Sequence, residues 1–102
     1  MKLTTKKREY LRKAAHKLEP IVRVGKDGYS DNLAQSIIEA ITPRELIKVK
    51  ILQNVEVDKR EISEKIARKI DAEIVGIIGR TVILFKENPE KPVISEELKT
   101  IK

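Results

Sequence analysis

The sequence predicts an α/β fold with the element order α-β-α-β-α-β-β and a four-stranded mixed sheet covered by helices. Segments with helical periodicity alternate with short β-branched runs along most of the chain. Two apolar runs near the C-terminal end are separated only by Gly79-Arg80, which fits a two-residue hairpin turn. Helical crossovers are expected to make parallel strand pairs with right-handed connections, and the hairpin adds an antiparallel strand.

The first helix is expected over residues 4–18, with Thr4 or Thr5 as its cap and Pro20 just beyond its end. At 100° per residue its apolar residues fall on one arc, namely Leu11, Ala14, Ala15 and Leu18. Residues 21–24 then form a short strand that leads into a loop.

The second helix is expected to begin after Ser30, a good N-cap, and to end near Ile41 because Pro43 prevents its continuation. Residues 46–51 follow as a strand with two distinct faces. One face carries Ile47, Val49 and Ile51, and the other carries Leu46, Lys48 and Lys50.

A third helix is expected after Asp58, which stands at capping-box spacing from Glu61. Its buried face is marked by Ile62, Ile66 and Ile70. Residues 72–78 and 81–86 are apolar on both faces, as in central strands. We expect a single domain over residues 1–86, followed over residues 87–102 by an extended exit and a loosely held tail or short helix.

Positive charge is concentrated in the first third of the chain. The 22 lysines and arginines exceed the 16 acidic residues by six. Residues 1–30 hold nine basic and three acidic side chains, so the thirteen of each sign in the remainder cancel. This concentration is typical of a polyanion binder, whereas a merely solubilising surface would not require it.

The loop Gly25-Lys26-Asp27-Gly28 stands between a strand and a helix. Two glycines let the backbone approach another backbone closely, and N–H groups at the start of the next helix would face an anion. KH-type modules hold nucleic acid with a loop of this GxxG form. The same four residues also suit an ordinary turn, so both interpretations stay open.

Several basic residues are candidate nucleic-acid contacts. Lys26 ranks first, and the aligned first-helix residues Lys6, Lys13 and Lys17 follow, expected to share a surface with it. Arg23 and Arg80 come next. Lys48 and Lys50 rank last, because the solvent-facing side of a strand explains them.

Other functions find little support in the sequence. The absence of cysteine excludes disulfides, thiolate metal sites and thiol catalysis. A lone His16 and the lack of phosphate-loop or dinucleotide motifs indicate no catalysis, cofactor, metal or small-molecule substrate. No apolar run approaches the roughly 18 residues of a membrane span and no signal peptide is visible, so a cytoplasmic protein without membrane association is expected. We also expect it to be a monomer. Scarce aromatics (Tyr10, Tyr29, Phe85) favour binding by charge and shape.

Four ordered blocks within residues 3–86 resemble the CRM domain, the chloroplast RNA splicing and ribosome maturation module that bacteria carry as stand-alone YhbY-like proteins. The blocks are residues 3–16, residues 20–28, residues 45–50 and residues 77–86. The resemblance implies a fold similar to the C-terminal domain of translation initiation factor 3. It also implies RNA contact through Gly25, Lys26, Asp27 and Gly28, flanked by Lys6, Arg23 and Arg80.

Three positions depart from the family pattern. Tyr29 replaces an aliphatic residue after the loop, Asp71 stands where a glycine often ends the third helix, and Phe85-Lys86 replaces Tyr-Arg. Stand-alone family members associate with precursors of the large ribosomal subunit. We therefore expect an RNA-binding protein that assists large-subunit assembly by holding ribosomal RNA. The alternatives are a general nucleic-acid-coating protein, a protein-interaction adaptor and, last, a small hydrolase.

Overall fold

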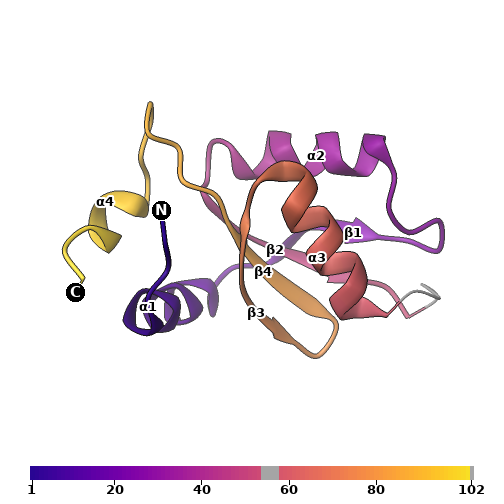
Figure 1. The fold of residues 1–102 in the computed structure, drawn as a ribbon. Coiled ribbons are helices and arrows are strands. Elements are labelled where there is room, and N and C mark those ends of the chain that lie inside the picture. The colour runs from indigo at the N-terminus through magenta and orange to yellow at the C-terminus, as the bar shows by residue number, and fades with distance from the viewer. Residues whose placement is uncertain (54–57, 102) are drawn as a thin grey trace.

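The computed structural model describes residues 1–53 and 58–101 and confirms the predicted α/β class and element order (Figure 1). Within these residues, no helix combines the length and the apolar character that a membrane crossing requires. The elements are α1 (Thr5–Ala15), β1 (Pro20–Val24), α2 (Asp31–Ile41), β2 (Leu46–Ile51), α3 (Lys59–Ile70), β3 (Glu73–Ile78), β4 (Thr81–Phe85) and a short α4 (Ser95–Leu98).

The four strands form one mixed sheet in the order β1-β2-β4-β3. β1 pairs with β2 in parallel, and β4 runs antiparallel to both of its neighbours. The expectation of a second parallel pair is therefore wrong, because β4 lies between β2 and β3. Burial explains this order, since Val82, Ile83 and Leu84 of β4 are all fully buried and a central strand is covered on both faces.

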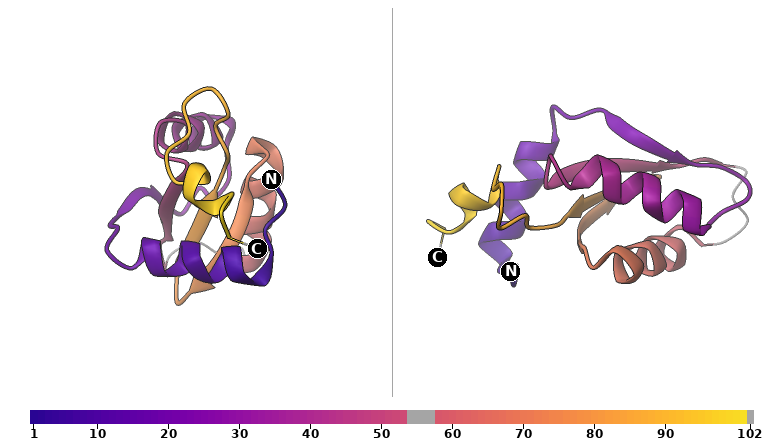
Figure 2. Two further views of the ribbon diagram at one scale, coloured as in Figure 1. Left: turned by 90° about the vertical axis from the view of Figure 1, so that its left-hand side faces the viewer. Right: turned by 90° about the horizontal axis from the view of Figure 1, so that it is seen from above.

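Helices cover the sheet unequally on its two faces (Figures 1 and 2). α2 and α3 cover one face, where Ile47, Val49 and Ile51 of β2 enter the larger core cluster. α1 and the C-terminal segment cover part of the other face, where Leu46 joins a second, smaller cluster. The two predicted faces of β2 are thus confirmed.

Side-chain caps define the helix starts as the sequence predicts. Thr4 Oγ1 accepts the Lys7 N–H at 3.2 Å, Ser30 Oγ accepts the Leu33 N–H at 3.0 Å, and Asp58 Oδ1 accepts the Arg60 N–H at 2.7 Å. α1 ends at Ala15, earlier than the predicted Leu18. α3 ends at Ile70, and its C-cap residue Asp71 adopts the left-handed conformation (φ 57°, ψ 48°) usually taken by glycine.

The C-terminal segment packs onto the domain and contains a short helix, α4, which is one of the two forms expected for it from the sequence. Leu98 of α4 is fully buried in the smaller core cluster. Glu45, also fully buried, accepts hydrogen bonds from the backbone N–H groups of Asn88 (2.7 Å) and Val93 (2.7 Å). A buried carboxylate is stable only when such donors surround it, and here the donors come from the C-terminal segment.

Candidate nucleic-acid interface

The 25–28 loop is an exposed turn at the end of edge strand β1. The Gly28 N–H donates to the Gly25 carbonyl at 2.9 Å, which closes the turn and leaves Lys26 and Asp27 exposed at its tip. Gly28 has a φ of 67°, a conformation that favours glycine. A Cβ on Gly25 would meet no heavy atom within 4 Å. The backbone conformation therefore favours glycine at position 28. At position 25 neither the backbone conformation nor a steric clash requires glycine.

The start of α2 is already occupied by groups of this chain. Ser30 takes the Leu33 N–H, and Asp31 places a carboxylate in the first turn. A phosphate at this helix end would meet a charge of the same sign. An anion is therefore expected to bind at the tip of the loop rather than at the start of α2, where the sequence pattern alone would place it.

Tyr29 packs beside the loop rather than presenting a free ring. Its ring contacts the larger core cluster, and the Lys65 ammonium lies 4.7 Å from the ring centroid. Burial, followed by the charge of Asp31 and a hydrogen bond to it (3.3 Å), raises the pKa of the Tyr29 hydroxyl. A shallow cavity here is lined by Lys26, Asp27, Gly28, Tyr29, Glu61, Ile62 and Lys65.

Arg80 lies at the same end of the sheet as the loop and has structural contacts there. Its Nε donates to the Ile51 carbonyl at 2.9 Å and its Nη2 to the Leu52 carbonyl at 2.6 Å. The Leu52 N–H in turn donates to the Val24 carbonyl at 3.0 Å. Arg80 therefore ties the end of β2, and through it the end of β1, to the hairpin.

Arg23 is exposed on the sheet face that α1 covers only in part. Its register partner on β2 is Lys50, whose partner on β4 is Thr81. Lys50 ranks last in the sequence-based order, because alternation along β2 shows only that it lies on the polar face of its own strand. Only the pairing between β1 and β2 shows that Arg23 and Lys50 are neighbours.

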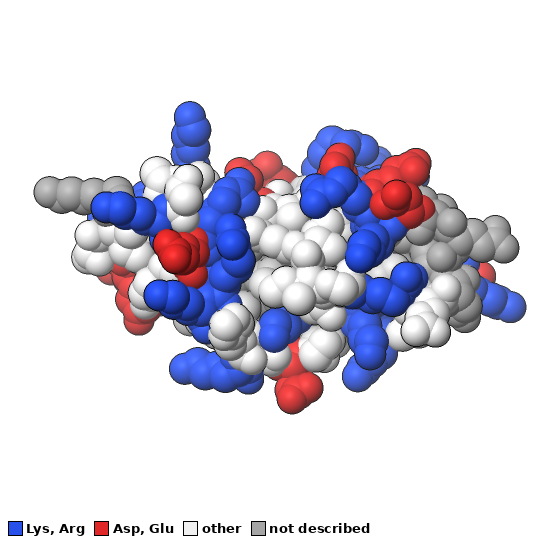
Figure 3. Space-filling model, turned by 90° about the horizontal axis from the view of Figure 1, so that it is seen from below, with Lys and Arg blue, Asp and Glu red and all other residues white. Residues whose placement is uncertain are grey.

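α1, which carries Lys6 and Lys13 and is followed closely by Lys17, lies at the other end of the molecule from the 25–28 loop (Figures 1 and 2). These lysines therefore do not flank the loop, and a surface that they share with Lys26 would span the length of the molecule. Lys17 also lies beyond the end of α1, so the three do not form one helical stripe. Figure 3 shows Lys and Arg side chains gathered toward both ends of the underside, with uncharged residues between them.

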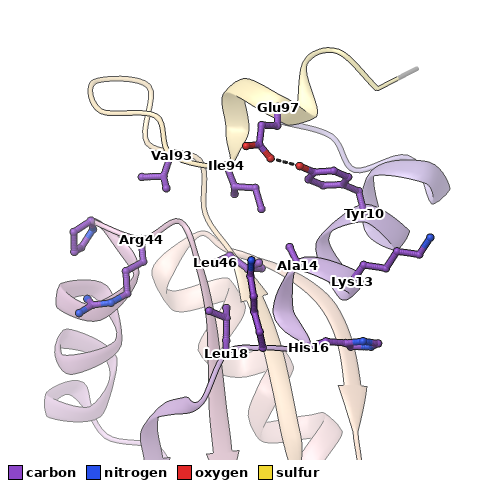
Figure 4. Close-up of a pocket in the computed structure, with 12 residues that line it drawn as sticks. Tyr10, Lys13, Ala14, His16, Leu18, Arg44, Leu46, Val93, Ile94 and Glu97 are labelled. Carbon is purple, nitrogen blue, oxygen red and sulfur yellow. Dashed lines mark hydrogen bonds between the residues drawn. The ribbon is translucent and has the colours of Figure 1, made fainter.

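Lys13 and Lys17 line a groove of about 970 Å³ between α1 and the C-terminal segment (Figure 4). Its walls include Leu18, Leu46 and Ile94. The Tyr10 hydroxyl donates to Glu97 across one end, and this hydrogen bond is the main reason that the pKa of Tyr10 is raised. Lys6 is exposed on α1 outside the groove.

Comparison with known proteins identifies relatives over nearly the whole chain. Residues 3–86 match the CRS1 / YhbY (CRM) domain. The probable RNA-binding protein YqeI of Bacillus subtilis is 45% identical over 92 residues, which are 90% of this chain and 96% of that protein. An RNA-binding protein of Haemophilus influenzae is 32% identical over 91 residues, which are 89% of this chain and 92% of that protein.

A solved structure shares the fold as well as the sequence. The solution structure of the hypothetical protein SAV1595 from Staphylococcus aureus superposes with a TM-score of 0.73 at 38% sequence identity. The match covers 90% of this chain and 99% of that one.

Proposed function

The chain belongs to the CRS1 / YhbY (CRM) domain family, and on that premise we propose that it is a non-catalytic RNA-binding protein that holds RNA through the 25–28 turn. The observation that carries this proposal is the turn itself, which extends from an edge strand with Lys26 exposed at its tip. Relatives such as YqeI are named as RNA-binding proteins, which supports RNA as the ligand.

The turn would bind the RNA backbone by close approach and charge. Gly25 has open space around its α-carbon, so a phosphate can come near the backbone there. The Lys26 ammonium would neutralise that phosphate. Arg80 would contribute indirectly, by keeping the strand ends beside the turn in place.

The basic residues near α1 would add contacts at a distance from the turn. The molecule is 40 Å long, and α1, with Lys6 and Lys13 in it and Lys17 just after it, lies at the end opposite the turn. An RNA long enough to reach both ends would have phosphates neutralised by these lysines as well as by the turn. Such contacts position the protein on RNA and carry no base information.

The RNA that we propose is ribosomal RNA in a precursor of the large subunit, bound by a cytoplasmic monomer. This choice follows from the family resemblance. Its test is crosslinking of the full chain to RNA in cells, followed by sequencing of the attached RNA. Enrichment of large-subunit ribosomal RNA is the expected result, and enrichment of other RNA classes instead would contradict the ribosomal assignment.

A general nucleic-acid-coating protein is the second candidate. It is favoured by the state of the three aromatic residues: Tyr29 packs against Lys65, Phe85 is buried, and the Tyr10 hydroxyl donates to Glu97. Titration with RNA and DNA of the same sequence separates the two candidates, because 2′-hydroxyl contacts give RNA the advantage. Equal affinity for both would favour the coating protein.

A further inference from the structure

We infer that Arg23 and Lys50 form a second RNA-binding site, for the sugar–phosphate backbone, on the part of the sheet that α1 leaves uncovered. This inference rests on the proposed function and deepens it, because it adds a binding surface and a route for the RNA beyond the turn. The new parts of this site are Lys50 and the uncovered face of the sheet.

Strand register brings the two cations together. Arg23 on edge strand β1 is paired with Lys50 on β2, and neighbouring strands lie only about 4.8 Å apart. Val22 and Val24 point into the larger core, as do Val49 and Ile51. Because side chains alternate along a strand, Arg23 and Lys50 both point away from that core, onto the partly uncovered face. Both are exposed.

The charges of this pair are not balanced by ion pairs within the described residues. The three ion pairs found in residues 1–53 and 58–101 involve Glu87, Glu73 and Asp71, and none of these contacts Arg23 or Lys50. Like charges directly opposite one another on neighbouring strands are destabilising. A bound polyanion would remove this repulsion, so the pair costs stability in the free protein and strengthens binding.

Two nearby basic side chains, in contrast, have structural roles at this sheet. The Lys48 ammonium donates to the Leu18 carbonyl at 3.0 Å, and the Arg80 guanidinium holds two carbonyls at the end of β2. Their side chains are half-buried and engaged with the backbone. Arg23 and Lys50 differ from them in exposure and in having a like charge as register partner.

The residues around Arg23 and Lys50 favour contact with the RNA backbone rather than with the bases. The row that contains Arg23 and Lys50 continues through Thr81 to Ile78, which is 57% exposed. No aromatic residue stands in this row, so bases have no platform for stacking. Cations and a threonine hydroxyl suit phosphates and ribose hydroxyls, and such contacts depend little on base identity.

The test compares the parent chain with Arg23→Gln and Lys50→Gln, each of which removes one charge. Lys69→Gln is the matched control, because Lys69 is an exposed lysine on α3, which covers the opposite face of the sheet. Affinity is measured at several salt concentrations for a labelled fragment of large-subunit ribosomal RNA and for poly-U and poly-A. A thermal melt of each variant at low salt is measured in parallel.

Each sheet variant is expected to bind all three RNAs about fivefold more weakly, with a salt slope smaller by about one. Each is also expected to melt about 1–3 °C higher than the parent, because the like-charge repulsion is gone. The control should bind like the parent and melt no higher than it, because Lys69 lies in the last turn of α3, where a positive charge favours the helix dipole. Weaker binding together with a higher melting temperature is a result that a purely structural role of either side chain would not produce.

Three other results would overturn the inference. Sheet variants that bind like the control, while the parent binds RNA, would remove this site and leave the proposed function standing. Weaker binding with a lower melting temperature would mean that the side chains support the fold, and a loss confined to one RNA sequence would mean base recognition. A parent chain that binds none of the RNAs would overturn the proposed function itself.

Discussion

The carboxylate of Glu45 accepts two hydrogen bonds from Ser95, one from the backbone N–H at 2.9 Å and one from the hydroxyl at 2.8 Å. Together with the N–H groups of Asn88 and Val93, these donors surround a fully buried charge at the start of β2. Glu45 itself has a φ of 65°, so this corner is conformationally restricted as well. The contacts join segments fifty residues apart.

Replacing Glu45 with glutamine is expected to destabilise the protein by about 2 kcal/mol. The amide –NH₂ would face a backbone N–H in either orientation, because both carboxylate oxygens accept from the backbone. Urea unfolding measures the change, and exposed Glu96→Gln serves as the control. An unchanged midpoint for Glu45→Gln would show that the carboxylate contributes nothing to stability.

The same carboxylate predicts a loss of stability in acid. Burial alone would raise the pKa of Glu45, but hydrogen bonds from Asn88, Ser95 and Val93 outweigh burial and lower it. A folded pKa below the unfolded one, roughly 4.3, gives stability that is complete above that pH and is lost as pH falls through the folded value. Unfolding free energies at pH 7, 4 and 3 should fall more steeply for the parent than for Glu45→Gln. Parallel profiles would contradict the assignment.

Asp71→Gly is expected to stabilise the protein by about 0.5–1 kcal/mol, because glycine adopts the left-handed C-cap conformation without a Cβ clash. The exposed ion pair with Lys86 (3.9 Å) that the change removes is worth little. Asp71→Ala is the control, since it removes the same carboxylate but keeps the clash, and it should be less stable than the parent. Thermal melts decide, and a glycine variant less stable than the parent would show that the aspartate side chain matters more than the backbone.

Changing Lys26 and Asp27 to glycine and alanine should leave stability within about 0.5 kcal/mol, because both side chains are exposed at the tip of a turn. RNA affinity should fall, with Lys26 responsible for most of the loss. Gly28→Asp should bind less well still and also melt lower, since φ at this position is 67°. Titration of a labelled ribosomal RNA fragment and a melt of each variant separate binding from folding. Variants that fold and bind like the parent would make the loop only a turn.

Binding should depend strongly on salt. Neutralisation of about four to six phosphates predicts a slope of log K against log[salt] of roughly −3 to −5. Changing Lys6, Lys13 and Lys17 together to glutamine should flatten that slope and weaken binding to unrelated RNAs by similar factors. Filter binding over a salt series measures both. A slope near zero for the parent would rule out electrostatic binding, and a loss specific to one RNA would show that these lysines recognise bases.

Local pattern in the sequence determined which segments become helices and strands and which faces they bury. The caps at Ser30 and Asp58 and the alternation along β2 depend on residues within one or two turns of each other. Such short-range rules can be applied without knowing the fold. The same rules marked the 25–28 loop and the charge around it, which are the parts of the candidate interface that sequence could supply.

Only the tertiary structure decided how distant segments meet. The insertion of β4 between β2 and β3, the pairing of Arg23 with Lys50, and the burial of Glu45 under residues 88–95 each join residues far apart in the chain. The separation of Lys6 and Lys13 from Lys26 is likewise a consequence of where α1 crosses the sheet. Periodicity shows which face of an element is apolar but not which neighbour covers it, because that choice depends on packing the whole core at once.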